Sequence, residues 1–204
     1  MKSADAHLIC MRHAQSVNVS AHQAGALSEV PLTDLGRHQA EVAARSVAGA
    51  GITAIYASTA VRAEQTARVI GSHLGLPVVL AADLTEVWLG VREGAIDEAT
   101  HQMTAEVLRA WIVDGNLAAR VADGETGYQV QGRVSSTLKR IGLDHGNQPV
   151  LIIGHVASLT TGINALCGNG PDVWGSPLPH AVAFTMTRHE QTWHCTWPVA
   201  HTSP

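Results

Sequence analysis

The sequence predicts an α/β fold, a three-layer sandwich in which helices flank a mostly parallel central sheet. Two observations support this prediction. Short apolar runs, typical of buried strands, alternate with longer segments whose apolar residues recur at helical spacing. In addition, 46% of the 204 residues are hydrophobic and 15% are charged, a composition that supports one sizeable core. Strand–helix alternation implies parallel strands with helices on both faces of the sheet.

The first strand is expected at residues 7–11, a short apolar run near the N-terminus. A helix is then expected at residues 33–50, because Thr33 is a suitable N-cap and apolar residues follow it at helical spacing. Gly51 ends this helix. The second strand is expected at residues 52–57.

The next helix is expected at residues 59–73, with Ser58 or Thr59 as its N-cap. Gly75 ends this helix, since glycine readily adopts the left-handed conformation that follows a last helical turn. A third, short strand is expected at residues 78–80.

The second half of the chain continues the alternation and closes with a hairpin. The expected elements are a helix at 96–113, a loop at 114–124, a helix at 125–141, a strand at 150–153, a helix at 157–166 and antiparallel strands at 181–187 and 192–197. Trp193, Cys195 and Trp197 would share one face of the last strand. The tail after Pro198 is expected to be disordered. No linker separates domains, so residues 1–204 are predicted to form one domain.

The charge and cysteine content limit the possible partners. A formal net charge of -4 argues against broad nucleic-acid or membrane-surface binding, because both need a basic face. No apolar run approaches the ~20 residues of a membrane helix, and the N-terminus lacks a signal segment. The three cysteines form no CxxC pair, and Cys10 is expected to be a buried free thiol. We therefore expect a soluble, cytoplasmic protein, while its oligomeric state stays open.

Chemically active side chains follow the predicted strands. His13 follows the first strand, Ser58 the second and His155 the strand at 150–153. Arg12 precedes His13, and Arg62 lies one turn into a helix. Because functional residues collect beyond the carboxyl ends of parallel strands, we expect these side chains to form one compact cationic pocket.

Such a pocket suits a phosphoryl group. The planar forks of Arg12 and Arg62 can each donate two hydrogen bonds to phosphoryl oxygens. A neutral imidazole offers a nitrogen that can attack the phosphorus atom. Glu86 lies among apolar residues, which favour the protonated form of a carboxyl group, and could protonate the leaving oxygen.

Taken singly, an Arg-His or Gly-His pair at a strand end is usually a solvated turn, and a lone glutamate is usually a surface carboxylate. Their order along the chain, together with two further strings, resembles the histidine phosphatase superfamily, also called phosphoglycerate-mutase-like. The shared motifs are Arg12-His13-Ala14, the string from Leu32 to Ala40, the string from Ser58 to Ala67, Glu86 with Gly90 and Glu93-Gly94 after it, and Gly154-His155. The position of the acid upstream of the second histidine favours the first branch.

The resemblance implies a hydrolase, a phosphomonoester phosphatase that needs no cofactor and no metal. His13 would be the nucleophile that becomes phosphohistidine. Arg12, Arg62 and His155 would hold the phosphoryl oxygens. Glu86 would protonate the leaving group and then help to activate water. The implied partner is a small-molecule phosphate ester.

The chain departs from the family pattern at three places near these residues, Ala14, Val156 and Asn18, and matches it at Ser16. Ala14 stands where glycine is usual, and Val156 replaces the usual glycine after the second histidine. Ser16 matches the serine or threonine that often follows, and is a candidate phosphate-binding residue. Asn18 is a second candidate, although it lies five residues after His13 and the family's asparagine usually lies six after.

The resemblance also implies a small cap segment over the pocket, at about residues 87–124. Its beginning is apolar, with Val87, Trp88, Leu89 and Val91. These side chains either pack under the cap or line the pocket, and in the second case the leaving group should be partly apolar or aromatic. His180, just before the hairpin, could face the same pocket.

Two other functions compete with hydrolysis. A cofactor-dependent phosphoglycerate mutase resembles this chain but carries an arginine- and tyrosine-rich insertion after the catalytic acid. Residues 91–98 are short and lack such a cluster, which favours hydrolysis. A non-catalytic phospho-ligand-binding module would lack some of the core residues, and all five are present.

Overall fold

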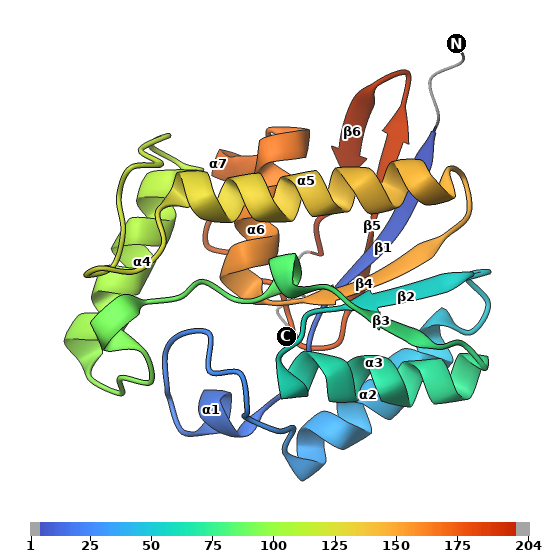
Figure 1. The fold of residues 1–204 in the computed structure, drawn as a ribbon, viewed down its shortest axis with the longest axis horizontal. Helices are drawn as coiled ribbons and strands as arrows, with labels where there is room; N and C mark the ends of the chain where they lie inside the picture. The colour runs from blue at the N-terminus through green and yellow to red at the C-terminus, as the bar shows by residue number, and fades with distance from the viewer. Residues whose placement is uncertain (1–4, 199–204) are drawn as a thin grey trace, which may run out of the picture.

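The computed structural model describes residues 5–198 and confirms the α/β class, with a six-stranded sheet between layers of helices (Figure 1). The strands are β1 (Ala6–Arg12), β2 (Ala54–Ala57), β3 (Val78–Leu80), β4 (Val150–Gly154), β5 (Ala183–His189) and β6 (Thr192–Cys195). They lie in the order β3-β2-β4-β1-β5-β6. The first four in this order are parallel, and β5 and β6 form an antiparallel hairpin at one edge.

Helices cover both faces of the sheet. They are α1 (Val17–Ser20), α2 (Asp34–Val47), α3 (Val61–Leu74), α4 (Glu98–Ile112), α5 (Gly127–His145), α6 (Val156–Cys167) and α7 (Gly170–Val173), with 3₁₀ turns at Ala82–Leu84 and Gly90–Arg92. Figure 1 shows α2 and α3 on one face and α5 and α6 on the other. Helix α4 lies beyond the sheet, at the same end of the molecule as α1.

The core consists of two clusters, one on each face of the sheet. In β1, Leu8 and Cys10 point towards α5 and α6, whereas Ile9 and Met11 point towards α2 and α3. Every residue of β4 is buried. Burial on both faces explains why β1 and β4 read as continuous apolar runs in the sequence rather than as alternating ones.

The N-terminal cap of α3 differs from the prediction. Helix α2 begins as predicted, with the Thr33 hydroxyl accepting a hydrogen bond from the Gly36 amide. Helix α3, however, begins at Val61 after Ala60, which offers no side-chain cap, so the predicted capping by Ser58 or Thr59 is wrong. The reason is that Ser58 lies at the carboxyl edge of the sheet, where its amide pairs with Ile153 and its hydroxyl contacts His155.

Helices α4 and α5 start at capping residues that the sequence contains but the periodicity did not mark. The Asp97 carboxylate caps α4 by accepting from the Thr100 amide. Thr126 and Gln129 form a reciprocal capping box at the start of α5, which runs on to His145. Helices α1 and α7 were not predicted, because four residues are too few to show a helical period.

The terminal hairpin is confirmed, with Trp193 buried against the core. Strand β6 ends at Cys195, so Trp197 follows the strand instead of sharing its face. Cys10 is a buried free thiol, as predicted. The tail expected to be disordered after Pro198 lies outside the described residues.

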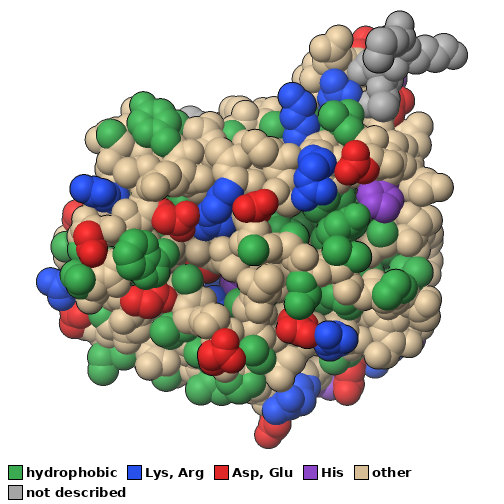
Figure 2. Space-filling model, viewed as in Figure 1, with side chains coloured by type: hydrophobic (Ala, Val, Ile, Leu, Met, Phe, Trp, Pro, Cys, Tyr) green, Lys and Arg blue, Asp and Glu red, His purple; other side chains and the backbone are tan. Residues whose placement is uncertain are grey.

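The surface mixes charges of both signs. The face shown in Figure 2 intersperses Lys and Arg side chains with Asp and Glu side chains. The lack of nucleic-acid and membrane partners and the cytoplasmic location stay predictions. Within residues 5–198, no helix combines the length and the apolar character that a bilayer crossing requires.

We predict that α5 and α6 tolerate no added methyl group where they meet. A Cβ atom at Gly162 of α6 would lie 2.3 Å from Val134 Cγ1 of α5, whereas one at Gly132, also in α5, would meet nothing within 4 Å. Gly162→Ala should therefore lower the free energy of unfolding by about 1–3 kcal/mol. Gly132→Ala should raise it by about 0.5–1 kcal/mol. Urea unfolding measures both, and equal stability of the two variants would contradict the packing described.

Candidate active site

The predicted convergence at the carboxyl edge of the sheet is confirmed. The amide of His13 donates to the Gly154 carbonyl at 2.9 Å, and the amide of Ser58 donates to the Ile153 carbonyl at 2.9 Å. These bonds extend the parallel ladder beyond β1 and β2 and hold both loops against β4. His155 follows β4 directly, and its ring centroid lies 5.0 Å from that of His13. The two imidazoles therefore lie on the same side of the sheet.

The hydrogen bonds of His13 define its tautomer. Nδ1 lies 2.7 Å from the Ala14 carbonyl oxygen, which can only accept, so Nδ1 carries the proton. Arg62 Nε donates to Nε2 at 3.3 Å, so Nε2 carries a lone pair. Burial, and then the charges of Arg62 and Arg12, hold the His13 pKa well below its usual value. At neutral pH this side chain presents an unprotonated nitrogen.

Helix α3 places Arg62 in the site, where the side chain is almost fully buried. Nη2 donates to the Ala26 carbonyl at 2.9 Å, and Nη1 donates to the Leu27 carbonyl. Thr66 Oγ1 donates to the Arg62 carbonyl at 2.7 Å and accepts from the Ala14 amide at 3.1 Å. One threonine thus couples the helix that carries the arginine to the loop that carries His13.

Two buried side-chain nitrogens near the site have no hydrogen-bond partner among the described residues. They are Nε of Arg12 and Nδ1 of His155. His155 Nε2 lies 2.8 Å from Ser58 Oγ, so a Ser58 hydroxyl that donates to Nε2 leaves the proton on Nδ1. Burial lowers the Arg12 pKa to about 10, and the guanidinium stays charged at neutral pH. Since an unmatched buried donor costs about 1–3 kcal/mol, these groups favour an anion with acceptor oxygens.

Glu86 has polar rather than apolar neighbours. Its carboxylate accepts hydrogen bonds from the amides of Val87 at 2.9 Å, Ser158 at 2.8 Å and Ala157 at 3.1 Å. The last two amides belong to the first turn of α6, whose N-terminus favours negative charge. The expectation of an apolar environment is wrong, because the sequence around Glu86 does not reveal these N–H groups from a distant helix.

Of the two further phosphate-binding candidates, only Asn18 reaches the cavity. Asn18 lines it, while its Oδ1 accepts a hydrogen bond from Ser16 Oγ at 2.7 Å. This bond aims the amide NH₂ of Asn18 away from Ser16. Ser16 is fully buried and does not line the cavity, so its predicted contact with a phosphoryl group is replaced by a contact with Asn18. Ala14 adopts no positive φ, so alanine is accommodated there without strain.

Two motif glutamines and a glycine brace the segment that leads from His13 to α2. Gln39 Oε1 accepts from the Gln15 amide at 2.8 Å, and Gln65 Oε1 accepts from the Leu32 amide at 2.9 Å. A Cβ atom at Gly36 would lie 1.9 Å from the Gln15 carbonyl oxygen, so only glycine permits this close approach. The strings 32–40 and 58–67 therefore serve to position the loop that carries Asn18.

The side chains of Arg12, His13, Arg62 and Glu86 lie around a cavity of about 260 Å³. Its lining is Arg12, His13, Asn18, Val19, Gln23, Ala24, Gly25, Arg62, Glu86, Val87, Leu89, His101, Thr104 and Val156. Residues 87–124 contribute part of this wall. Of their four apolar leading residues, Val87 and Leu89 line the cavity, whereas Trp88 is 47% and Val91 80% exposed. Helix α4 adds His101 and Thr104.

His180 contacts His13 but does not line the cavity, so the suggestion that it faces the pocket is not borne out. Its Nδ1 donates to the His13 carbonyl at 2.9 Å, and its ring centroid lies 5.5 Å from that of His13. Burial, followed by the charge of Arg12, lowers the His180 pKa to about 4. Its place just before the hairpin was the one available signal.

Among residues 5–198 no three His, Cys, Asp or Glu side chains gather as a metal site, and metal independence stays a prediction.

Known proteins resemble this chain over most of its length. The family model of the histidine phosphatase superfamily (branch 1) matches residues 8–198. A "Probable phosphoglycerate mutase GpmB" of Yersinia pestis (strain Pestoides F) is 32% identical over 160 residues, 78% of this chain and 73% of that protein. A mycobacterial glucosyl-3-phosphoglycerate phosphatase has the same fold, with a TM-score of 0.77 and 23% identity over 96% of this chain and 99% of the other. For Bacillus stearothermophilus YhfR the TM-score is 0.79, with 25% identity over 94% and 95%.

The buried imidazoles predict how stability depends on pH. Burial and neighbouring cations lower the pKa of His13 and of His155, so below about pH 6.5 the unfolded chain binds protons that the folded site does not. The free energy of unfolding should therefore fall as the pH drops below about 6.5, by up to about 1.4 kcal/mol per pH unit and imidazole. Urea unfolding at successive pH values measures this slope. His155→Asn should reduce it, and an unchanged slope would contradict the assignment.

Proposed function

The chain belongs to branch 1 of the histidine phosphatase superfamily, and we propose that it hydrolyses a small-molecule phosphate ester through a phosphohistidine on His13. One observation carries the proposal. His13, whose Nε2 is unprotonated, lines a cavity that Arg12 and Arg62 also line. A nucleophilic nitrogen beside two guanidinium groups is the arrangement that phosphoryl transfer requires.

In the first step, the Arg62 Nε–H moves from His13 Nε2 to a phosphoryl oxygen, and the released Nε2 lone pair attacks phosphorus in line with the ester oxygen. The N–P bond forms as the P–O bond breaks, and the electron pair leaves with the alcohol oxygen. Arg12 Nε, the free N–H groups of Arg62 and the Asn18 amide donate to the equatorial oxygens. His155 is fully buried and does not line the cavity, so its hold on a phosphoryl oxygen stays a prediction. The hydrogen bond to Ala14 stabilises the positive charge that develops on the imidazole.

Glu86 manages the proton in both steps. The Glu86 carboxyl group lines the cavity and must hold a proton when the ester oxygen leaves. Glu86 then gives its proton to the leaving alcohol oxygen. In the second step it takes a proton from water while the water oxygen attacks the phosphohistidine. The N–P bond breaks, its electron pair returns to His13, and phosphate leaves.

The cavity supports hydrolysis over bisphosphate-dependent phosphoryl transfer. Among the described residues that line it, Arg12 and Arg62 are the only Lys or Arg side chains, and both serve the reacting phosphoryl group. A mutase must also hold a second anionic group of its substrate. Arg92, in the segment that would carry the mutase insertion, is half-exposed and lies 4.0 Å from Asp97. The convergence of nucleophile, acid and donors argues against a binding module without catalysis.

Removing His13 should abolish turnover. We expect His13→Ala to lower kcat by at least about 10⁴-fold, the scale on which loss of a covalent nucleophile acts. It should also abolish an acid-labile label after incubation with a ³²P-phosphoester and rapid quenching. His73→Ala, which removes an exposed histidine from α3, is the control and should retain both. A His13→Ala protein that is labelled and active would rule out the proposed intermediate.

The lining also predicts the type of leaving group. Val87, Leu89 and Val156 are apolar, and Thr104 is neutral. We expect kcat/KM for aryl and neutral alkyl phosphates to exceed that for 3-phosphoglycerate by roughly tenfold or more, since a carboxylate would find no further Lys or Arg among the described lining residues. A substrate series at constant pH measures this ratio. A clear preference for phosphoglycerate would contradict it.

A further inference from the structure

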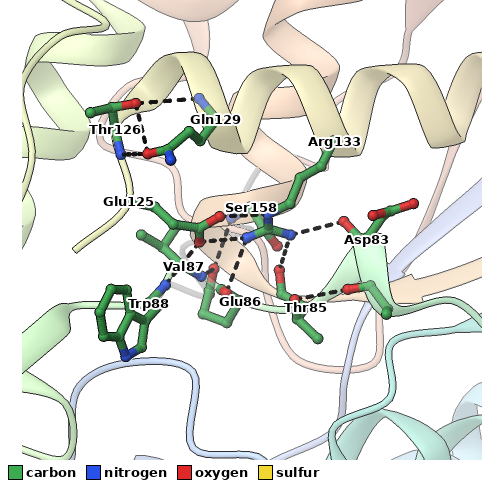
Figure 3. Close-up of polar contacts among 11 residues, drawn as sticks. Asp83, Thr85, Glu86, Val87, Trp88, Glu125, Thr126, Gln129, Arg133 and Ser158 are labelled. Carbon is green, nitrogen blue, oxygen red and sulfur yellow. Dashed lines mark hydrogen bonds and ion pairs between the residues drawn. The ribbon is translucent and has the colours of Figure 1, made fainter.

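We propose that Arg133 of α5, acting with Glu125, is a positioning residue that holds Glu86 in place as the general acid (Figure 3). The inference rests on the proposed function, because it concerns the acid of that reaction. Arg133 itself does not line the reaction cavity. It acts on the backbone of the segment that carries Glu86.

Glu86 lies in a segment that regular structure does not fix. Residues 85–89 belong to no helix or strand. On one side Glu86 lines the reaction cavity, and on the other it borders a groove of about 640 Å³ that is also lined by Trp88, Glu125 and Arg133. Because the groove offers room for the side chain, the position of the carboxylate depends on contacts that restrain its backbone as well as on the three amides that donate to it.

Arg133 supplies those contacts with its whole guanidinium group. Nη1 donates to the carbonyl oxygens of Asp83 at 2.8 Å and Thr85 at 2.7 Å, and Nη2 donates to the Glu86 carbonyl at 3.1 Å. Nε donates to Glu125 Oε1 at 2.8 Å, and Nη2 donates to Glu125 Oε2 at 2.9 Å. These hydrogen bonds engage all five N–H groups of the side chain. Lysine has three donors and no planar fork, so it cannot reproduce this set.

Glu125 holds the other side of this segment, and we call the Arg133–Glu125 pair the clamp. Its Oε2 accepts from the Trp88 amide at 3.0 Å, and its own amide donates to the Trp88 carbonyl at 2.9 Å. The capping box of Thr126 and Gln129 follows immediately and fixes the start of α5, as Figure 3 shows. The clamp therefore brackets Glu86 between carbonyls held by Arg133 and an amide held by Glu125.

The geometry makes α5 and α6 one support for Glu86. Helix α6 holds the carboxylate through the Ala157 and Ser158 amides, while α5 holds the backbone through Arg133. The two helices are in close contact at Gly162 and Val134, the residue next to Arg133. The Arg133 and Glu125 side chains are only 17% and 19% exposed, which shields their ion pair from solvent more than a surface pair.

The test compares leaving groups. Aryl phosphates need little protonation of the leaving oxygen, whereas alkyl phosphates need the acid. We expect Arg133→Gln to lower kcat for an alkyl phosphate on the order of 10²-fold, as a displacement of about 1 Å can, and to change kcat for p-nitrophenyl phosphate much less. KM should stay within about threefold, because the phosphoryl-binding groups are untouched. Arg133→Lys should fall between the wild type and Arg133→Gln.

The matched control is Arg140→Gln, which makes the same change in the same helix at an exposed side chain. It should leave both rates unchanged. If Arg133→Gln does not fold, Glu125→Gln carries the test, since it removes the ionic grip but keeps an acceptor oxygen. It should shift the alkyl-to-aryl ratio in the same direction. A folded Arg133 or Glu125 variant that slows both substrates equally, or neither, overturns the inference.

Glu86→Gln separates this inference from the proposed function. If Glu86→Gln loses alkyl turnover selectively and the Arg133 and Glu125 variants do not, Glu86 is the acid and the clamp does not position it. If Glu86→Gln itself shows no dependence on the leaving group, the assignment of the acid fails, and the positioning role fails with it. The phosphohistidine label on His13 tests the remainder of the mechanism independently.

Discussion

The 2.7 Å hydrogen bond from His13 Nδ1 to the Ala14 carbonyl is the constraint around which the site is built. It fixes one tautomer and leaves a lone pair on Nε2, to which Arg62 Nε donates a hydrogen bond at 3.3 Å. The bond depends on the backbone of a loop that is itself held to β4 by the His13 amide. Burial and two guanidinium groups keep the ring neutral, so the same cations that attract a phosphoryl dianion also preserve the nucleophile.

Parallel strand pairing brings these groups together with little help from any single loop. β1 and β4 end side by side, so His13 and His155 meet, and β2 ends beside β4, so Ser58 reaches His155. The helix that follows β2 brings Arg62 back over the same edge. The result is a cluster with an excess of buried donors, a cost to the free chain that an anion with several acceptor oxygens offsets.

The sequence predicted the parts of the site that depend on strand ends. Apolar runs located β1 and β4, so the residues directly after them, His13 and His155, could be placed at one edge. Contacts between distant elements could not be predicted. The amides of α6 that surround Glu86, and the Arg133 fork that holds its backbone, depend on how three separate segments pack. Ser16, Asn18 and His180 depended on loop geometry, which local periodicity does not encode.

The mechanism requires His13 to be a neutral imidazole with its proton on Nδ1 and an unprotonated Nε2, to which Arg62 Nε donates. Nitrogen-15 NMR of the histidine-labelled protein, titrated from about pH 8 to about pH 5 and assigned with a His13→Gln variant, measures this directly. A buried, neutral His13 should give a signal set with a protonated Nδ1 and an unprotonated Nε2 that stays unchanged through about pH 6.5. A His13 ring that becomes an imidazolium near pH 6.5, or that carries its proton on Nε2, would contradict it.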